Sequence, residues 1–301
     1  MRLAITGATG FLGHYIVAQA SEAGHRCRCW YRPGGDRGGL NGAQIEWLPG
    51  ELGNAAAADE LVAGCDAVVH AALYHPGGGF RGGEGELLDF VDKNVLGTLR
   101  LIEAARGAGV GRFIFISSCA VHDRILPDRP LDETHPTCSS SHYGAHKAAL
   151  EQFVHSYGFG QGYDICALRP TGIYGLARPA EASKWFELVR AVAAGQPVEC
   201  RRGGKEVHAA DVARAVELLL TAPGIAGESY NCYDRYVSEF EVATLAAQLS
   251  GSGSPIAGEA TQPKNQIVTD KLRALGMRFS GRPLLEATIG EMLAAVAGGQ
   301  R

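Results

Sequence analysis

The segment RLAITGATGFLG at residues 2–13 constrains the fold of this chain more than any other. It places three glycines, Gly7, Gly10 and Gly13, directly behind a five-residue, largely apolar run. Glycine weakens regular structure by roughly 0.5–1 kcal/mol relative to alanine, so these glycines indicate that something approaches the backbone closely. A glycine-rich turn between a strand and a helix points backbone N–H groups and the positive helix end at an anion such as a pyrophosphate. The spacing is G-x-x-G-x-x-G instead of G-x-G-x-x-G, so an ordinary tight turn is the alternative.

The first half of the chain alternates short β-rich runs with helical patterns. Strands are expected over residues 2–6, 25–31, 66–72, 112–118 and from Asp164, with helices near 11–23, 87–107 and from about Ser141. This βαβ rhythm predicts an α/β fold with a doubly wound parallel sheet. The rest of the chain is more helical and less regular, which predicts a smaller mixed, mainly helical substrate domain. We expect a Rossmann domain over 1–171 and a substrate-binding domain over 172–301, with the segment around 205–235 returning to the Rossmann core.

Apolar residues in the helix from about Ser141 define its expected buried face. Leu150, Phe153, Val154 and Tyr157 follow the i, i+3, i+4, i+7 spacing of a single helix face, which is the pattern of an amphipathic helix. We therefore expect these four side chains to be buried.

Composition and charge exclude several classes of function. Apolar residues make up 46% of the 301 residues and charged residues 20%, which describes a globular chain with a full core. A formal net charge of −4 provides no basic field for a nucleic acid. The first strand begins at Arg2 or Leu3, without room for a signal peptide, and no apolar run of membrane-spanning length follows, so we expect a cytoplasmic protein without a membrane segment. The eight cysteines form no Cys-x-x-Cys pair and do not cluster with histidine, so neither a metal site nor a disulfide framework is expected.

The expected end of the second strand bears on cofactor preference. In dinucleotide sites an acidic residue at this place accepts hydrogen bonds from the adenosine ribose. Here the place holds Trp30, Tyr31 and Arg32. Arg32, with Arg28 on the same face of the strand, favours a 2′-phosphate and hence NADP, because guanidinium presents a fork of donors to phosphate oxygens. NAD stays open, since Asp36 would serve as the ribose acid if its loop folds back, and Arg32 would then be a solvated strand-end arginine.

The stretch SHYGAHKAALE carries a second pattern, in which Tyr143 and Lys147 lie four residues apart on one face of the expected helix. A tyrosine hydroxyl with a pKa near 10 transfers protons poorly at neutral pH, but an adjacent ammonium favours the phenolate and lowers that pKa. The preceding strand delivers Ser117 and Ser118 to the same edge of the sheet, where a serine hydroxyl would hold a substrate oxygen. The pattern predicts acid–base chemistry; the alternative is a half-buried tyrosine beside a surface lysine, with serines that cap a turn.

Eight sequence blocks, in this order, resemble the extended short-chain dehydrogenase/reductase family. They are TGATGFLG (6–13), VVHAA (68–72), NVLGT (94–98), ISSCAV (116–121), YGAHK (143–147), LRPTGIYG (168–175), VHAADVARA (207–215) and SYNCYD (229–234). The resemblance covers most of the chain. It implies an enzyme that transfers a hydride between a nicotinamide cofactor and a substrate carbon.

The resemblance also implies the roles of individual residues. Tyr143 transfers the proton of the substrate oxygen, Lys147 tunes Tyr143 and orients the nicotinamide ribose, Ser118 fixes the substrate oxygen, and Asn94 supports Lys147 through water. Ser118 is chosen because it lies four residues before His122, where the family usually has a tyrosine. The expected cofactor contacts are Gly7, Thr9, Gly10, Phe11, Leu12, Gly13, Arg32, Glu51, Leu52, His70, Ala71, Ala72, Ser117, Tyr143, Lys147, Pro170 and Thr171.

Departures from the family pattern bear on the reaction. Family dehydratases carry an Asp-Glu pair after the catalytic serine, and this chain has Cys119 and Ala120 there, which disfavours dehydration. Glu51 stands where the family usually has aspartate beside adenine. We expect an NADP-dependent reductase of a carbonyl substrate; the alternatives are a nucleotide-sugar epimerase that reoxidises its own cofactor and a non-catalytic NADP-binding sensor. The expected partners are a small-molecule substrate and, as an open alternative, a second copy of the chain in a homodimer. The glycine-rich loop 76–85 is expected to act as a lid.

Overall fold

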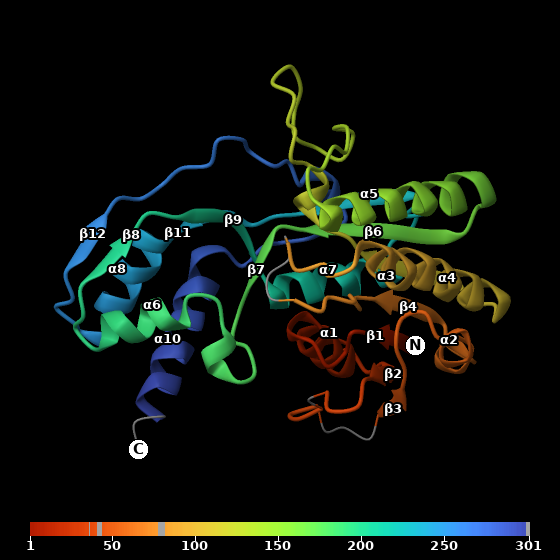
Figure 1. Ribbon diagram of the computed structural model, residues 1–301, viewed down its shortest axis with the longest axis horizontal. Helices are drawn as coiled ribbons and strands as arrows, with labels where there is room; N and C mark the ends of the chain where they lie inside the picture. The colour runs from red at the N-terminus through yellow and green to blue at the C-terminus, as the bar shows by residue number, and fades with distance from the viewer. Residues whose placement is uncertain (36, 41–43, 78–81, 299–301) are drawn as a thin grey trace. The chain divides into compact units, whose positions relative to one another are not determined.

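A seven-stranded parallel sheet forms the centre of the first of two units into which the chain divides (Figure 1). This unit comprises Met1–Pro170, Val212–Cys232 and Ile267–Met277, and the second comprises Thr171–Asp211, Tyr233–Gln266 and Arg278–Arg301. The computed structural model describes residues 1–35, 37–40, 44–77 and 82–298. The chain therefore leaves the first unit after Pro170 and returns to it twice.

The strands of the large sheet lie in the order β10-β6-β5-β4-β1-β2-β3, and every neighbouring pair is parallel. They are β1 (Arg2–Thr6), β2 (Arg26–Tyr31), β3 (Ile45–Pro49), β4 (Ala67–His70), β5 (Arg112–Ile116), β6 (Asp164–Pro170) and β10 (Glu228–Cys232). Strands that are covered on both faces carry near-continuous apolar runs. All of β4 and all but the first residue of β5 are accordingly buried.

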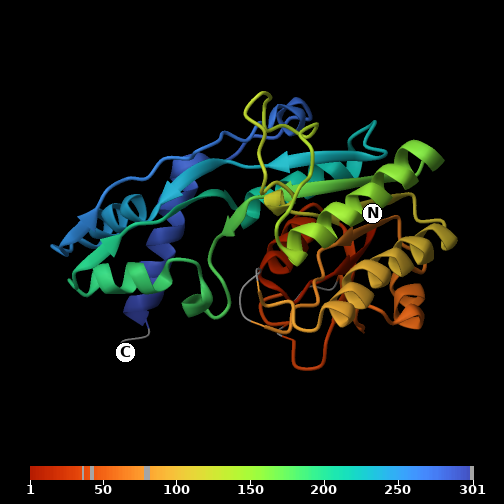
Figure 2. The ribbon, with the colours of Figure 1, turned by 45° about the horizontal axis from the view of Figure 1, so that its top comes forward.

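Helices cover both faces of this sheet. They are α1 (Phe11–Glu22), α2 (Ala55–Val62), α3 (Leu87–Val91), α4 (Gly97–Gly107), α5 (His142–His155), α9 (Asp270–Ala274) and α7 (Ala209–Thr221), which joins this unit from Val212 onward. Because parallel crossovers are right-handed, connections that run in opposite directions across a sheet place their helices on opposite faces. The connections β1→β2 and β4→β5→β6 run in opposite directions, so α1 lies on one face and α4 and α5 lie on the other (Figure 2). The predicted doubly wound parallel sheet is confirmed.

The buried face of α5 differs from the predicted one. Leu150 and Val154 are buried as expected, but Phe153 is 40% exposed. The inward face also carries Lys147 and Glu151, and Phe153 lies about 200° around the helix from Glu151. Polar partners at the strand ends hold these two charged residues inside, so apolar spacing alone misplaces the buried face.

The predicted helix over 87–107 contains an interruption. A π turn over Asp92–Leu96, which includes Asn94, joins α3 to α4. Such turns insert an extra residue and occur frequently at functional sites. Sequence patterning gave no prediction for β3 or α2, because β3 is a half-exposed edge strand and α2 is an alanine-rich helix with weak periodicity.

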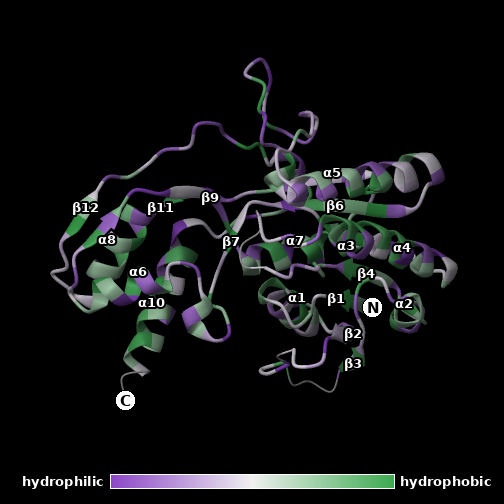
Figure 3. Ribbon diagram, viewed as in Figure 1, coloured by the Kyte–Doolittle hydropathy of each residue, from purple (hydrophilic) through white to green (hydrophobic). Residues whose placement is uncertain are grey.

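The second unit combines short strands with three helices, as the prediction of a smaller, mainly helical C-terminal part requires. Its strands are β7 (Gly172–Tyr174), β9 (Gly203–His208) and β11 (Arg235–Ser238) in one sheet, and β8 (Val198–Cys200) and β12 (Ile256–Gly258) in another. Its helices are α6 (Phe186–Ala193), α8 (Glu239–Ser250) and α10 (Gly281–Gly298), which enclose an apolar core. Figure 3 shows hydrophobic and hydrophilic residues mixed along α6, as expected of a helix with one buried face. In the described ranges, none of the helices has the length and apolar character needed to span a membrane.

Candidate cofactor and catalytic site

The glycine turn after β1 leaves no room for side chains. Gly7 has a φ of +71°, and a Cβ there would lie 2.7 Å from the Ala71 carbonyl carbon and the Ala72 nitrogen at the end of β4. A Cβ on Gly13 would lie 2.0 Å from the Gly7 oxygen. Both contacts are with backbone, which cannot move aside as a flexible side chain does. The end of β1, the first turn of α1 and the end of β4 are thus in close backbone contact.

The start of α1 has the features of an anion site. The helix begins at Phe11 behind Gly10, which has no side chain to cap it, and residues 11–14 include no acidic residue. The first N–H groups of a helix have no partner within the helix, and the helix dipole is positive at this end. Phe11, Leu12 and Gly13 therefore supply backbone donors beside a turn cleared of side chains. This arrangement fits the diphosphate of a dinucleotide.

A cavity of about 630 Å³ opens beside this turn, at the carboxyl ends of β1, β2 and β4. This is the switch point of the sheet, because the strand order reverses between β1 and β4. Cavities of this size hold small molecules and cofactors. Eight predicted cofactor contacts line it: Gly7, Thr9, Gly10, Arg32, Glu51, Leu52, Ala71 and Ala72.

Sequence reasoning missed part of the cavity wall. The additional lining residues are Trp30, Pro33, Gly34, Gly35, Gly50, Leu73, Tyr74, His75 and Lys93. Most of them follow the end of β2, β3 or β4. Ligands of open α/β sheets bind beyond the carboxyl ends of the strands, so this position in the sequence was the signal that would have identified them. Trp30 and Gly50 face one another, since a Cβ on Gly50 would lie 2.4 Å from the Trp30 Nε1.

The remaining predicted contacts lie outside this wall. Phe11, Leu12 and Gly13 form the first turn of α1, Pro170 ends β6, and Thr171 begins the second unit.

The two arginines predicted at the ribose position have different environments. Arg32 is exposed at the cavity, and none of the described residues forms an ion pair with it. Arg28 is buried; its Nη1 donates to the Glu60 carbonyl at 2.6 Å, near the end of α2, and its Nε pairs with Glu46 at 3.0 Å. The prediction that Arg28 joins Arg32 at a phosphate is therefore wrong, because internal acceptors engage its guanidinium. Asp36, the alternative ribose acid, lies outside the described residues.

His70 belongs to a buried polar chain. Its Nδ1 lies 2.7 Å from the Thr6 Oγ1 and its Nε2 lies 2.9 Å from the Thr98 Oγ1. Burial, with a smaller effect of the Lys147 charge, lowers the pKa of His70 to about 3, so the ring is neutral. The imidazole thus connects β1 and β4 to α4, and the cavity wall begins at the next residue, Ala71.

The residues predicted to be catalytic come together where α5 lies against the end of β5. The Ser118 hydroxyl lies close enough to the Tyr143 hydroxyl to lower its pKa, and it accepts a hydrogen bond from the Ala120 N–H at 3.1 Å. One helical turn further along α5, the Lys147 ammonium donates to the Ile116 carbonyl at 2.7 Å. Tyr143, Lys147 and Ser118 thus share one junction between a helix and a strand end.

Burial dominates the ionisation of these groups. It raises the pKa of Tyr143, and the nearby Ser118 hydroxyl opposes the change. It lowers the pKa of Lys147 to about 7, and the negative charge of Glu151 opposes that change. The expectation that Lys147 holds the Tyr143 pKa below its usual value is therefore wrong for this structure, because desolvation of the phenolate is the largest influence and raises that pKa. The Tyr143 phenol is protonated at neutral pH.

Asn94, in the π turn, is engaged by backbone groups. Its Oδ1 accepts from the Tyr74 N–H at 2.8 Å, and its Nδ2 donates to the carbonyls of Tyr74 at 2.9 Å and Phe90 at 3.0 Å. The amide therefore fixes the segment after β4, which forms part of the cavity wall. Its support of Lys147 through water stays a prediction.

Two residues hold the start of α5: Ser141, near which the helix was expected to begin, and Glu84, which sequence reasoning did not single out. The Ser141 hydroxyl accepts from the Gly144 N–H at 3.1 Å, and the Glu84 carboxylate accepts from the Tyr143 N–H at 3.3 Å. Backbone hydrogen bonds lower the pKa of Glu84, which is buried. Residues 78–81 of the predicted lid, 76–85, lie outside the described residues.

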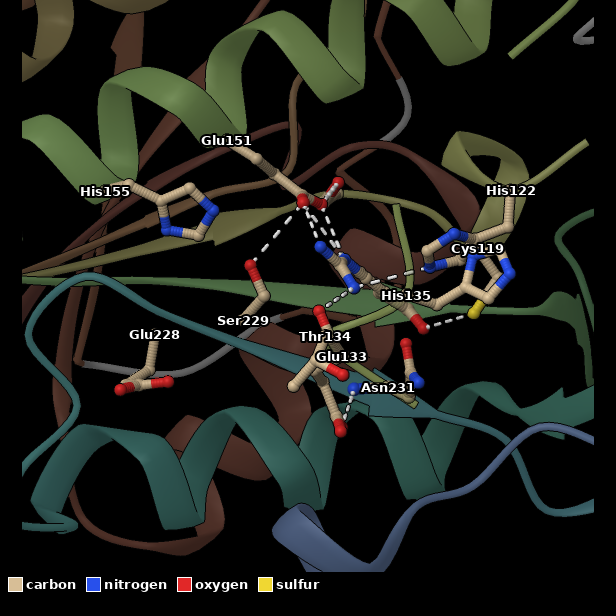
Figure 4. Close-up of polar contacts among 12 residues, drawn as sticks. Cys119, His122, Glu133, Thr134, His135, Glu151, His155, Glu228, Ser229 and Asn231 are labelled. Carbon is tan, nitrogen blue, oxygen red and sulfur yellow. Dashed lines mark hydrogen bonds and ion pairs between the residues drawn. The ribbon is translucent and has the colours of Figure 1, made fainter. Parts of the chain in front are cut away.

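A buried ion pair lies next to the residues predicted to be catalytic, and Figure 4 shows Glu151 with the polar side chains around it. Glu151, one turn beyond Lys147 on α5, pairs with Arg169 of β6, and both side chains are almost completely buried. The Ser117 hydroxyl, predicted to contact the cofactor, donates instead to Glu151. The signals that sequence reasoning missed were a charged residue within the buried strand β6 and a charged residue on the apolar face of α5. Over the described part of the chain, no group of three or more His, Cys, Asp or Glu side chains is placed to hold a metal ion.

Comparison with known proteins shows the family to which this chain belongs. Residues 3–232 match the family model described as NAD dependent epimerase/dehydratase family. The chain is 30% identical over 249 residues to the dTDP-glucose 4,6-dehydratase of Streptomyces niveus, covering 77% of this chain and 72% of that protein. It is 31% identical over 195 residues to the 3-beta-hydroxysteroid dehydrogenase of Mycolicibacterium neoaurum, covering 63% of this chain and about half, 52%, of that protein.

A solved structure shows the same fold. The UDP-glucose 4-epimerase of Thermus thermophilus, in complex with NAD, aligns with a TM-score of 0.78 at 22% identity over 99% of both chains. At this identity the likeness bears on the fold alone. Taken with the family match over residues 3–232, these findings show that the chain belongs to the NAD dependent epimerase/dehydratase family, a group of extended short-chain dehydrogenases/reductases, as the sequence motifs indicated.

Proposed function

We propose that this chain is an oxidoreductase that prefers NADP(H) and reduces a carbonyl substrate, or oxidises the corresponding alcohol, with Tyr143 as the acid and base. The observation that carries the proposal is the junction of Ser118, Tyr143 and Lys147 at the end of β5. When bound, the nicotinamide supplies or accepts the hydride. The Ser118 hydroxyl holds the substrate oxygen, and Tyr143 gives that oxygen its proton. The Lys147 ammonium stabilises the phenolate that remains.

The ionisation of the junction supports reduction as the favoured direction. Because burial raises the pKa of Tyr143, the phenol carries its proton at neutral pH, which is the state needed to donate to a carbonyl oxygen. Lys147, whose pKa is lowered to about 7 by burial, is partly charged at the same pH.

The charges of the cavity wall support a preference for NADP. Arg32 and Lys93 line the wall, and Glu51 is the one carboxylate among its described residues. A 2′-phosphate adds negative charge that an exposed guanidinium binds through charge-assisted hydrogen bonds. Arg32 is the residue proposed to make this contact.

Two other activities are weighed against reduction. Dehydration is disfavoured, because Ala120 has no ionisable group and burial raises the pKa of the Cys119 thiol to about 12. Epimerisation of a nucleotide sugar is the second candidate, since a UDP-glucose 4-epimerase shares the fold. The same junction would move the proton of the sugar hydroxyl, and a bound nicotinamide would take up and return the hydride.

The test is a screen of aldehydes, ketones and nucleotide sugars for oxidation of NADPH and of NADH, followed by Tyr143→Phe. We expect this variant to lower turnover by about 10²–10⁴-fold with cofactor binding intact, as is typical of lost acid–base catalysis. The matched control is Tyr157→Phe, which removes a hydroxyl that donates to Glu103 outside the site. Full turnover by Tyr143→Phe would overturn the assignment. Conversion of a sugar without net NADPH oxidation would favour the epimerase, and binding without any turnover would favour a sensor.

A further inference from the structure

Three successive turns of α5 contact three consecutive residues at the end of β5. We call these contacts the α5–β5 seam: Tyr143 with Ser118, Lys147 with the Ile116 carbonyl, and Glu151 with the Ser117 hydroxyl. Residues four apart lie on one helix face, so the seam is a single row. Two of its contacts hold groups proposed to act on the substrate. The third, at Glu151, has no part in that chemistry.

Glu151 is held with unusual completeness. Its side chain is 0% exposed, and the Arg169 Nε lies 3.0 Å from each of its carboxylate oxygens. The Arg169 Nη2 approaches one of these oxygens to 2.5 Å, and the Ser229 hydroxyl of β10 approaches to 3.4 Å (Figure 4). Carboxylate and guanidinium planes joined in this way fix orientation as well as distance. The pair therefore ties α5 to the segment after β5, to the carboxyl end of β6 and to the start of β10.

A buried ion pair is weak evidence for stability, because apolar residues of similar volume often serve as well or better. A role in positioning the residues of the seam explains the Glu151–Arg169 pair better, since Arg169 also contacts the segment that follows Ser118. Its Nη1 lies 3.4 Å from the His122 Nε2 and 3.4 Å from the Glu133 carbonyl, and its own carbonyl accepts from the Cys119 thiol at 3.0 Å. The segment that follows Ser118 is thus anchored to the same pair.

The electrostatic surroundings of Lys147 give Glu151 a second effect. On α5, Lys147 has Tyr143 and His146 as neighbours, and burial keeps both of these neutral at pH 7. From β4, His70 is neutral for the same reason. Across the pair lies the Arg169 cation of β6. The Glu151 carboxylate is the charge that acts on Lys147 in the direction opposite to burial.

We infer that Glu151, clamped by Arg169, is a positioning residue that fixes Lys147 and the Ser117–Ser118 segment in the arrangement used for proton transfer. The inference rests on the proposed function only for the consequence on turnover. The inference also has an electrostatic half, which does not depend on the proposed function. Without the Glu151 carboxylate, the Lys147 ammonium loses its proton at a lower pH.

The first test measures Lys147 directly. The chain has six lysines, so protein labelled with ¹³C at the lysine Cε gives a spectrum in which Lys147→Met assigns the resonance. In Glu151→Gln we expect the titration midpoint of Lys147 to fall by about one pH unit or more. The matched control, Glu103→Gln, removes an exposed carboxylate of α4 and should leave the midpoint unchanged. An unchanged midpoint in folded Glu151→Gln would overturn the electrostatic half.

Removing one partner of a buried ion pair leaves the other charge buried without a partner, so Glu151→Gln is at risk of not folding. The double variant Glu151→Met with Arg169→Met replaces the pair by apolar side chains, so the Lys147 midpoint can be measured in a protein without an unpaired buried charge. We expect it to fold and to show the lowered Lys147 midpoint. A wild-type midpoint in this variant contradicts the inference.

The second test uses the substrate found for the wild-type protein. The rate of reduction falls as Lys147 loses its proton, so in Glu151→Gln the falling alkaline limb of the kcat profile should move to lower pH by the shift seen in the spectrum. Arg169→Lys keeps the positive charge but loses the paired N–H donors of the guanidinium. It should lower kcat about tenfold or more with a near-wild-type Lys147 midpoint. A kcat unaffected by both changes would overturn the positioning role. If Tyr143→Phe were fully active, the proposed function would fail while the spectroscopic result for Lys147 would still stand.

Discussion

The glycine turn after β1 and the α5–β5 seam are opposite ways to build a site at the same edge of a sheet. At the turn, side chains are absent and backbone groups pack within 2–3 Å of where a Cβ would stand. At the seam, charged and polar side chains fill the interior and satisfy one another. The first region offers a ligand only its shape and fixed backbone dipoles, and it tolerates no added atom. The second depends on ionisation, so it responds to pH and to the charge of residues that touch no ligand.

The largest expected effect tests the steric side of this comparison. Gly7→Ala puts a methyl group against the backbone of Ala71 and Ala72, whereas Gly24→Ala places one in open space at a similar φ of +79°. Left-handed strain of about 1–2 kcal/mol is common to both variants, and backbone crowding adds about 1–3 kcal/mol at Gly7 alone. We expect Gly7→Ala to lose cofactor binding more than 100-fold, and Gly24→Ala to retain it. Urea unfolding and cofactor titration measure the two quantities, and equal losses in both variants would show that crowding is not the cause.

The second prediction concerns the buried charge of the seam. In the folded protein Lys147 has a pKa of about 7, against about 10.4 in an unfolded chain. Between these values the unfolded chain binds more protons, so this residue makes stability rise with pH from about 7 to 10.

Lys147→Met should remove that rise, which is on the order of a few kcal/mol, and should also lower turnover and weaken cofactor binding. The unfolding free energy at pH 7 and pH 9.5 tests it, with the exposed Lys264→Met as control. A wild-type slope in Lys147→Met would place the titrating group elsewhere.

The smallest expected effect lies at the exposed rim of the cavity. Arg32→Ala should weaken NADPH binding about tenfold, the value of one partly solvated charged hydrogen bond, and leave NADH binding nearly unchanged. Trp30 lines the same cavity, so its fluorescence reports both titrations. Arg26→Ala, at the far end of β2, is the matched control. Equal or tighter binding of NADH by the wild-type protein would refute the NADP preference.

The two regions also differ in how far the sequence predicted them. The turn was recognised because its strand, glycines and helix are contiguous, and the same holds for Tyr143 and Lys147 on one helix. Glu151 with Arg169, and Glu84 with the Tyr143 N–H, were missed because their partners lie 18 and 59 residues away. Arg28 was misread for a related reason: the carbonyls that hold it belong to α2, a helix that apolar periodicity does not reveal. Local pattern thus predicts which residues share a turn or a helix face better than it predicts the distant partners that hold those residues in place.

The excursion of the chain into the second unit has a consequence for biosynthesis. The strand β6 ends at Pro170, but its outer neighbour β10 is not complete until Cys232. At ribosomal rates of roughly 5–20 residues per second, β6 remains an open edge for several seconds after it emerges. An unpaired parallel edge is a template for wrong partners. Ser229, which approaches Glu151, arrives on that same late strand, so a nascent chain contains the complete glycine turn after β1 well before α5 has all of its partners in the sheet.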